Sequence, residues 1–523
     1  MTNSSKCAVC GVSASLKCMA CKQVFYCGKE HQKIHWKKGH KAECKCYEIA
    51  RNDVLGRHLR ASRDIKCGEI ILRESPLIYG PKVASAPLCL GCHRTLSTPV
   101  GGSNFYKCRK CSWPLCGPDC EHSQHHLHEC QLMASRNFRA KIDYSGQVGK
   151  KESAYCVILP LRCLLMKASQ PADFERFSEL EDHLNERKDT PLYNVLRANL
   201  VTFVKTILGM HESEEEVLRV AAILDTNAFE IRQNNLGRKV RAIYPSASMF
   251  SHDCISNSRH TFDDNMQIVF IAKTPIAKGD IISTSYTQPL WSTIMRRSHL
   301  LQAKCFECTC RRCLDPTELN TFTGAITCSR CKVGKIISTN PMDNSAIWKC
   351  QLCPHKLSAK QINLGNQAIQ NEIDSLDKTS AKAFEEFLFR YRDTLHEKNT
   401  HILQVKYALT QLYDFSMIEH NDAALKRKLE LCQELLEIAE LLDGGWSIFR
   451  GNLILDLQEA MVVQAKREFL NGLLTREATQ EKLLESMNLL KEALEIMKLE
   501  PDMKQMLNER TQLLAKELEM EDS

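Results

Sequence analysis

The spacing of the cysteines constrains this fold more than any other feature of the sequence. The chain has 27 cysteines in 523 residues, and most of them stand in Cys-x-x-Cys pairs. The sequence has no uninterrupted apolar run of about 18 residues and no apolar start of signal-peptide type, so we expect a protein that works inside the cell. Disulfides rarely persist there, and clustered cysteine pairs therefore indicate metal ligands.

Two blocks of cysteine and histidine follow the same order, which makes them an internal repeat. Each block has three pairs followed by His-x3-Cys, and eight ligands are enough for two tetrahedral zinc ions. Several histidines crowd the end of the second block, and we choose His126 because it repeats the His-x3-Cys step of the first. The candidate ligands are Cys7, Cys10, Cys18, Cys21, Cys27, His31, His40 and Cys44 in the first block, and Cys89, Cys92, Cys108, Cys111, Cys116, Cys120, His126 and Cys130 in the second.

Two smaller sets of cysteines follow later in the chain. One has the spacing of a four-cysteine zinc ribbon, and the other has three cysteines and needs a distant fourth ligand. About six zinc ions bound by thiolates would change the formal charge of +7 to about −2, which removes the case for a general polyanion binder. The ribbon set is Cys328, Cys331, Cys350 and Cys353, and the incomplete set is Cys308, Cys310 and Cys313.

The remaining sequence divides into a β-rich part and a helical part. Residues 58–80 and 271–286 have similar strand-like character, which is typical of one domain interrupted by an insertion. After residue 355 apolar residues recur at helical spacings, with Gly444-Gly445 ending one helix and Pro501 ending the last. We expect either helix pairs that resemble tetratricopeptide repeats or a plain helical bundle covering the β-rich domain. The helical patterns run through 401–418, 425–439, 450–470 and 480–498.

The order of these motifs resembles the SMYD family of SET-domain lysine methyltransferases. The first block ends in YCGKEHQKIHWKKGHKAEC, which resembles a MYND zinc finger. The family's SET motifs are matched by LGRHLRASRDIKCGEIIL, DTNAFEI, IYPSASMFSHDCISN, IAKGDIISTSY and KCFECTCRRC. The second block stands where the family inserts its finger, whereas the first block and the ribbon are additions that look most like the arthropod SmydA subgroup.

The resemblance implies a multidomain α+β protein with a β-rich split SET domain. The expected domains are an N-terminal MYND-type finger (1–46), the first part of the SET domain (47–88), a second MYND-type finger inserted in it (89–130), the SET insertion with the core SET segment (131–300), a post-SET zinc segment (301–320), a zinc ribbon-like segment (321–356) and an α-helical TPR-like domain (357–523).

The resemblance also implies an activity, which is methyl transfer from S-adenosylmethionine to a protein lysine, on histone or non-histone substrates. It pairs the ligands of the first finger as Cys7, Cys10, Cys27 and His31 for one zinc, and Cys18, Cys21, His40 and Cys44 for the other. It makes Cys254 the distant fourth ligand of the post-SET zinc. The residues that match the family's cofactor contacts are Gly56, Arg57, Asn227, Ser251 and His252, Tyr286 is the catalytic residue of the lysine channel, and Phe306 is a wall of that channel.

Three positions depart from the family pattern and bear on activity. The second glycine of the G-x-G motif is His58, the asparagine of the NHSC run is Ser251, and the tyrosine before CFEC is Lys304. The alternative function is therefore a catalytically weak scaffold and transcriptional co-regulator whose fingers bind proline-containing peptides. In both cases we expect a monomer with protein partners in the nucleus and cytoplasm, no membrane association, and no primary role for nucleic acid.

Overall fold

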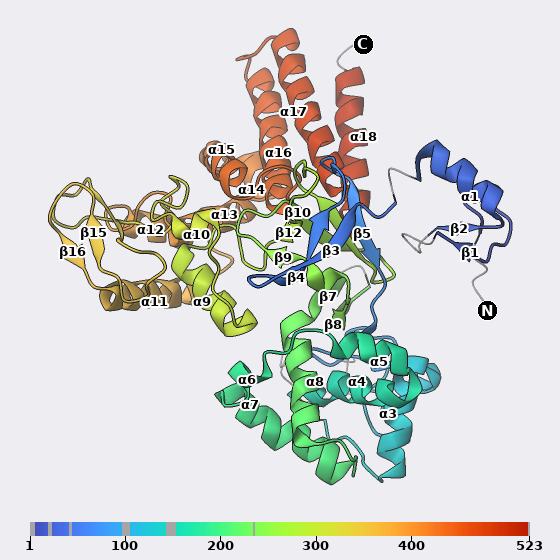
Figure 1. Ribbon diagram of the computed structural model, residues 1–523. Helices are drawn as coiled ribbons and strands as arrows, with labels where there is room; N and C mark the ends of the chain where they lie inside the picture. The colour runs from blue at the N-terminus through green and yellow to red at the C-terminus, as the bar shows by residue number, and fades with distance from the viewer. Residues whose placement is uncertain are drawn as a thin grey trace.

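The computed structural model describes residues 6–18, 24–40, 44–96, 105–142, 153–233 and 236–520. Short strands form the centre of the molecule, with the second Cys/His block and the helices of the insertion on one side (Figure 1). The long C-terminal helices lie on the opposite side, and the first Cys/His block stands apart from both. The expected α+β architecture is confirmed, with a β-rich SET region and a helical C-terminal region.

The first Cys/His block is a small unit with little regular structure. Strands β1 (Leu16–Lys17) and β2 (Phe25–Tyr26) pair antiparallel, and helix α1 (Lys29–His35) follows and continues into the short, kinked helix η1 (Trp36–His40). Its apolar cluster holds Cys18, Tyr26 and Cys44 with Val24 packed against them. So small a core supplies little folding free energy by itself, which agrees with a module stabilised by metal.

The central strands come from segments that are far apart in the sequence. A hairpin joins β3 (Tyr47–Asn52) to β4 (Gly56–Ala61), and β5 (Ile70–Glu74) pairs with β11 (Ile268–Ala272), which also pairs with β10 (Ser258–Phe262). A second sheet has the order β6 (Ile78–Gly80), β8 (Arg238–Ile243), β7 (Phe229–Gln233). The two β-rich segments expected to form one domain therefore do pair, and the second Cys/His block and a group of helices are inserted between β6 and β7.

The insertion is mainly helical and packs on the second Cys/His block. Its core joins Leu90 and Trp113 of that block to Leu161 and Leu224 of the helices. Helix α8 (Glu214–Asn227) begins where the Ser213 side chain accepts from the Glu216 amide, with glutamates in its first turn to complement the helix dipole. The other helices are α3 (Gln124–Ser135), α4 (Ile158–Ser169), α5 (Pro171–Ser178), α6 (Leu184–Arg187), α7 (Pro191–Leu196) and the short η2 (Pro118–His122), η3 (Ser153–Val157), η4 (Arg197–Val201) and η5 (Phe203–Ile207).

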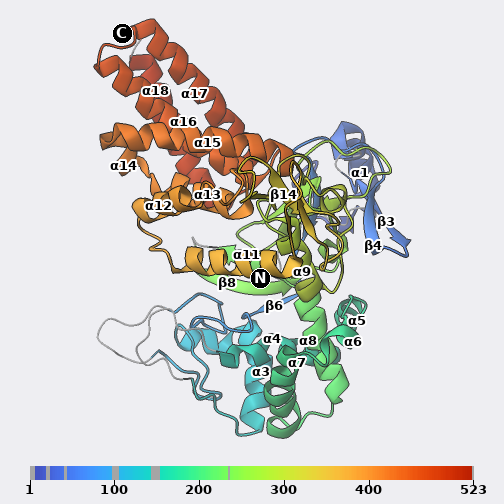
Figure 2. The same ribbon diagram turned by 90° about the vertical axis from the view of Figure 1, so that its left-hand side faces the viewer.

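After the SET strands come helices α9 (Thr293–Lys304) and α10 (Arg311–Leu314), then a small sheet, and then helices only. Strands β13 (Ile326–Thr327), β14 (Lys335–Ser338), β15 (Trp348–Cys350) and β16 (Lys356–Leu357) make an antiparallel sheet around the ribbon cysteines. Consecutive long helices then pack on one another, as Figure 2 shows for α15 to α18. They are α11 (Ala359–Ser375), α12 (Ala381–Tyr391), α13 (Thr400–Leu412), α14 (Phe415–His420), α15 (Asp422–Leu442), α16 (Ile448–Leu470), α17 (Arg476–Met497) and α18 (Lys504–Met520).

Two details of the helical region differ from the sequence prediction. The pattern over 480–498 does end before Pro501, but it is not the last helix, because Pro501 opens the short helix η7 (Pro501–Met503) and α18 follows directly. Proline fits the first turn of a helix, where its missing N–H would have no helical partner. The pattern over 401–418 is two helices, α13 and α14, because Asp414 caps a new start. Within the described residues, no helix is both long enough and apolar enough to cross a bilayer.

The C-terminal helices are docked on the SET strands through the turn between α15 and α16. The Trp446 ring lies against Gly68, where an added Cβ would come within 2.4 Å of it, and Trp446 donates its backbone N–H to the Lys273 carbonyl at 2.9 Å. Gly445 has φ +71° and passes so close to the same carbonyl that a Cβ would lie 2.2 Å from it. Asp443 forms an ion pair with the Lys273 ammonium.

A buried arginine joins β10 to the ends of the helices. Arg259 donates from Nε to the Trp446 carbonyl at 2.6 Å and from Nη1 to the Glu500 carboxylate at 2.7 Å, and it also binds the Ile496 carbonyl. The other oxygen of Glu500 accepts from the Thr261 hydroxyl at 2.7 Å. One guanidinium thus satisfies polar groups from three parts of the helical domain.

Replacing Arg259 by methionine would remove this guanidinium while keeping most of the apolar stem. The Glu500 carboxylate and two carbonyls would lose their donor in a buried place, so we expect the free energy of unfolding to fall by about 3 kcal/mol. Urea unfolding followed by circular dichroism measures the change. Lys382→Met is the control, because the Lys382–Glu386 pair is 87% and 60% exposed and its loss should change stability by less than about 0.5 kcal/mol. Equal effects of the two substitutions would contradict the docking role.

Candidate active site and metal centres

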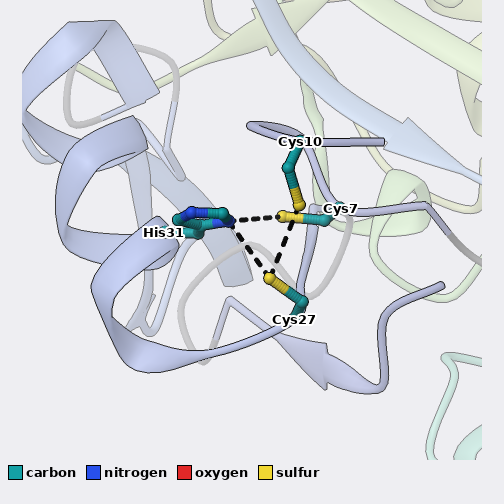
Figure 3. A group of neighbouring side chains, drawn as sticks. All are labelled: Cys7, Cys10, Cys27 and His31. Carbon is teal, nitrogen blue, oxygen red and sulfur yellow. Dashed lines mark hydrogen bonds between the residues drawn. The ribbon is translucent and has the colours of Figure 1, made fainter. Parts of the chain in front are cut away.

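The first metal-binding candidate lies at the start of the chain (Figure 3). The ligand atoms of Cys7, Cys10, Cys27 and His31 all lie within 4.8 Å of one another. Cys10 Sγ and Cys27 Sγ are 3.6 Å apart, and His31 Nδ1 is 3.1 Å from Cys27 Sγ. Zinc–sulfur bonds of about 2.3 Å at tetrahedral angles place two sulfur atoms about 3.8 Å apart, so the four donors fit zinc.

The structure describes three of the four predicted ligands of the other set in the first finger. Cys18 Sγ and Cys44 Sγ are 3.6 Å apart, and His40 is buried at 2% exposure. Cys21, the fourth predicted ligand, lies outside the described residues. His35 occupies a supporting place: its ring stacks on that of His40, with 5.1 Å between centroids, and its Nδ1 hydrogen-bonds the Tyr26 hydroxyl at 3.0 Å.

The second Cys/His block forms two complete clusters. The structure places His126, rather than the neighbouring His125, beside the cysteines, with Nε2 3.5 Å from Cys111 Sγ, whereas His125 hydrogen-bonds the Tyr79 hydroxyl at 2.8 Å. The pairs are interleaved, so one cluster takes the first and third pairs of the block and the other takes the second and fourth. The clusters are Cys89, Cys92, Cys116 and Cys120, and Cys108, Cys111, His126 and Cys130.

Sequence reasoning missed the arginine that anchors this block. Arg162 of α4 is 9% exposed and donates to both oxygens of Glu129, to the Leu90 carbonyl at 3.2 Å and to the Tyr79 carbonyl at 2.9 Å. Glu129 lies in α3 between the ligands His126 and Cys130. The pairing of Arg162 with Glu129 gives no sequence signal, because it joins two helices across an interval set only by the fold.

The post-SET cluster is completed from a distance. Cys254 Sγ lies 3.5 Å from Cys313 Sγ and 3.9 Å from Cys308 Sγ, and Cys310 is the fourth member. Fully buried Arg296 of α9 (Thr293–Lys304) donates to Cys254 Sγ at 3.2 Å and to Glu318 at 2.8 Å. Four thiolates around one Zn²⁺ carry a net negative charge, so this guanidinium offsets charge that would otherwise be buried unpaired.

The ribbon cysteines form the last complete cluster. Cys328 Sγ lies 3.6 Å from Cys353 Sγ and Cys331 Sγ lies 3.7 Å from Cys350 Sγ, and the four together meet the same 4.8 Å limit. The strands β13 to β16 bring the two pairs to one end of their sheet. All the donors are thiols, which suits zinc better than a hard cation.

Four residues predicted for the active site lie together beside the post-SET cluster. Ser251 and His252 form strand β9, which pairs in parallel with β12 (Ser283–Thr284), and Tyr286 follows two residues after β12. His252 Nδ1 accepts the Tyr286 backbone N–H at 3.0 Å. The His252 ring centroid is 5.2 Å from that of Tyr286 and 5.9 Å from that of Phe306.

The polar atoms of this aromatic cluster have different surroundings. Tyr286 donates its hydroxyl to the Phe250 carbonyl, and burial raises the pKa of the phenol to about 12. Burial lowers the pKa of His252 to about 4, which keeps the imidazole neutral and able to accept at Nδ1. The Ser251 hydroxyl is buried and has no hydrogen-bond partner among the described residues. A buried hydroxyl without a partner is a plausible contact for a polar ligand atom.

Two of the remaining predicted cofactor residues, Asn227 and Arg57, bind the segment after α5. Asn227, the last residue of α8, donates its amide to the Glu181 carbonyl at 2.7 Å and to the Ile223 carbonyl at 2.8 Å. Arg57 forms an ion pair with Glu179, and Gly56 opens β4 with φ +62°. His58, where the family keeps glycine, is 4% exposed and hydrogen-bonds the Gly56 carbonyl at 3.1 Å through Nδ1. Both donor hydrogens of Asn227 are thus used within the protein, and its side-chain carbonyl is the part left for a ligand.

A cavity of about 700 Å³ lies beside the aromatic cluster rather than within it. Ile294, Ser298 and Leu301 on one face of α9 form one wall, and Asn366 and Gln370 on α11 face them. Its lining reaches Glu307, the neighbour of Phe306, but includes none of the residues predicted to hold the cofactor. The cavity is therefore a separate space next to the predicted channel.

Comparison with known proteins identifies the parts of the chain. A MYND finger model matches residues 7–44, and a SET domain model matches residues 56–287. The SET domain-containing protein SmydA-8, isoform A, of Drosophila melanogaster is 28% identical over 344 residues, which are 63% of this chain and 70% of that protein. The histone-lysine N-methyltransferase SMYD3 of Homo sapiens is 24% identical over 273 residues, which are 49% of this chain and 59% of that protein.

These matches define the class as a SET-domain protein with an N-terminal MYND finger, and the structure places a second Cys/His block inside the SET match. The chain is similar to SmydA and SMYD proteins, as the sequence motifs predicted. Among solved structures, the SET domain of LSMT bound to lysine and AdoHcy covers 84% of this chain at 12% identity, with a TM-score of 0.26. That score is too low for a comparison of geometry.

The metal content gives a direct test of the ligand sets. We expect elemental analysis of the purified chain to find about six zinc ions, and about five after Cys254→Ser, because a hydroxyl is a poor replacement for a thiolate ligand of zinc. Cys432→Ser is the control, since Cys432 is a buried cysteine of α15 outside the clusters and its substitution should leave the zinc content unchanged. A wild-type content near four would mean that at least one ligand set is wrong.

Proposed function

We propose that the protein is an S-adenosylmethionine-dependent protein-lysine methyltransferase acting on histone or non-histone proteins. The observation that carries the proposal is the cluster of His252, Tyr286 and Phe306, which is held against the post-SET cysteines within a SET fold. The matched relatives include proteins named as histone-lysine N-methyltransferases of plants and mammals. The buried Ser251 hydroxyl and the free side-chain carbonyl of Asn227 are the groups we assign to cofactor contacts.

Bound S-adenosylmethionine would supply an electrophilic methyl group for in-line transfer to an amine. The protein's own task is to orient a neutral lysine amine and to exclude water. Tyr286 suits this task because its hydroxyl is fixed on the Phe250 carbonyl and its raised pKa keeps it protonated throughout the physiological range. We therefore assign Tyr286 an orienting role rather than that of a general base, and Phe306 the role of an apolar channel wall.

Reduced activity is part of this proposal. Ser251 offers one hydroxyl where the family has an amide that donates and accepts at once, and a lost hydrogen bond in such a site costs about 1–3 kcal/mol. The His58 imidazole fills a place where the family has no side chain. These differences weaken cofactor binding without removing the aromatic cluster.

A second candidate function is a scaffold in which the fingers recruit proline-containing peptides of other proteins. The specific observation is that Ile34 and Trp36 of the first finger are each 38% exposed, which leaves two large apolar side chains open on a small module. Exposed aromatic residues of this kind are common anchors in protein interfaces. We propose that either function operates in the nucleus and the cytoplasm, with the protein as a monomer.

Calorimetry with S-adenosylmethionine is the measurement that decides the main proposal. We expect saturable binding to the zinc-loaded chain, and no detectable binding at millimolar cofactor would exclude the enzyme. Tyr286→Phe should lower the methyl-transfer rate at least tenfold while changing cofactor affinity less than about threefold, because only the amine loses its orienting hydroxyl. Tyr407→Phe in the helical domain is the matched control and should leave both quantities unchanged.

Peptide pull-down tests the scaffold function. Trp36→Ala should reduce the recovery of a proline-containing peptide at least tenfold without changing the zinc content, because the exposed ring lies outside both ligand sets. Leu352→Ala is a control, since Leu352 is a similarly exposed apolar residue of the zinc ribbon, 69% exposed. Recovery that is unchanged by Trp36→Ala would count against peptide binding by this finger.

A further inference from the structure

A lysine amine lies beside the aromatic cluster of the candidate active site. Lys304 is the last residue of α9, and its Nζ is 5.4 Å from the centroid of the Tyr286 ring, an arrangement that attracts a cation to the ring face. The same Nζ donates to the Thr226 carbonyl at 2.6 Å. This is the position at which the SMYD pattern has tyrosine, so the substitution places a cationic group where the family has a phenol.

The helix ends around Lys304 create a place for positive charge. Thr226 is in the last turn of α8, where unpaired carbonyls give the helix end a partial negative charge. Arg187 of α6 binds the same region, donating to the Ala303 carbonyl at 2.8 Å and to the Thr226 hydroxyl at 3.1 Å. Asp225 is the nearby carboxylate, and it is shared with Arg241 at 3.2 Å and with the Tyr193 hydroxyl.

The charge state of Lys304 depends on these neighbours. Burial and the Arg187 guanidinium lower the pKa of the Lys304 amine to about 8, and Asp225 opposes the shift. His299 on the same helix has its own pKa lowered by burial and by Lys304, so it is neutral at pH 7 and above. The other facing groups, Tyr286 and Cys305, have raised pKa values and are neutral near pH 7. Lys304 is therefore mainly charged at pH 7 and mainly neutral at pH 9.

We propose that Lys304 is a specificity-determining residue whose ammonium group disfavours the sulfonium of S-adenosylmethionine relative to the neutral thioether of S-adenosylhomocysteine. The inference rests on the proposed function, because it requires a cofactor bound by the residues assigned above. Lys304 lies over the Tyr286 ring, whose centroid is 5.2 Å from that of His252 and 6.5 Å from that of Phe306. Its amine also donates to Thr226, the neighbour of Asn227, so a cofactor that touches these residues lies next to Lys304.

The physical basis is competition between two cations for one small site. Like charges a few ångströms apart in a partly buried site repel strongly enough to change an affinity at least tenfold. The Tyr286 face and the Thr226 carbonyl, which would favour a cationic ligand, are already used by Lys304. A site with this charge would retain the methyl-depleted product better than the methyl donor, which gives a slow enzyme without any loss of the lysine channel.

Calorimetric affinities of both ligands for the full-length, zinc-loaded chain test this inference. In the wild type at pH 7 we expect the ratio of the S-adenosylmethionine Kd to the S-adenosylhomocysteine Kd to be at least tenfold higher than in Lys304→Met. The repulsion is present below the pKa of Lys304 and is lost above it, so the wild-type ratio should fall towards the Lys304→Met value at pH 9. Lys304→Arg stays charged and should keep the high ratio at both pH values.

A lysine outside the site provides the matched control. Lys335 lies over the Phe322 ring at 3.6 Å from its centroid, so Lys335→Met removes a comparable cation–ring contact and should leave the ratio unchanged. If all variants bind both ligands with the same ratio, the Lys304 inference is wrong and the cofactor site stands. If neither ligand binds any variant, the proposed function fails and the inference fails with it. Mass spectrometry that finds Lys304 itself methylated would also overturn it, because the residue would then be a methyl acceptor.

Discussion

The candidate active site depends on one constraint: Cys254 and the distant cysteines Cys308, Cys310 and Cys313 form a single ligand cluster. Cys254 comes two residues after His252 of β9, and its partner Cys308 comes 54 residues later, two residues after Phe306. A metal ion bound by both segments closes this loop and fixes the distance between the two walls of the site. Arg296 makes the arrangement tolerable in a buried place, because it meets the thiolate charge with a guanidinium that Glu318 holds in position.

The same principle explains how so divided a SET domain remains ordered. The pairing of β5 with β11 encloses the second zinc module and a helical insertion, so it joins strands that are far apart in the sequence. The inserted module has its own ligands, close together in sequence, and its own anchor in the Arg162–Glu129 pair. Most of its stabilising contacts are therefore internal, and Arg162 adds a bond to the Tyr79 carbonyl of β6. The long-range pair of β5 with β11 then has only to form its own backbone hydrogen bonds and side-chain contacts.

The parts of the structure that sequence could predict are those fixed by short-range geometry. Cysteine spacing predicted which residues would gather, because a pair two residues apart has few ways to bind a tetrahedral ion, and the repeat singled out His126. Strand-like character predicted the partnership of the two SET segments. The sequence did not predict the buried arginines Arg296 and Arg162 or the partner Glu318. A buried arginine in an amphipathic helix looks like a surface residue until its partner is known. Lys304 was recognised only as a departure, and its position over Tyr286 depends on how three helix ends converge.

Arg259 and Glu500 have a consequence for the order in which the protein folds. Glu500 lies near the far end of the chain, 241 residues after Arg259, and the arginine is buried only when α17 and the turn at Trp446 are in place. During synthesis each zinc module can fold as soon as its own ligands have left the ribosome, because its metal site is local. The SET strands, in contrast, present an uncovered guanidinium and an uncovered Gly68 surface until almost the whole protein has been made. A chain released early, before residue 500, would contain complete zinc modules around a SET domain that has not closed.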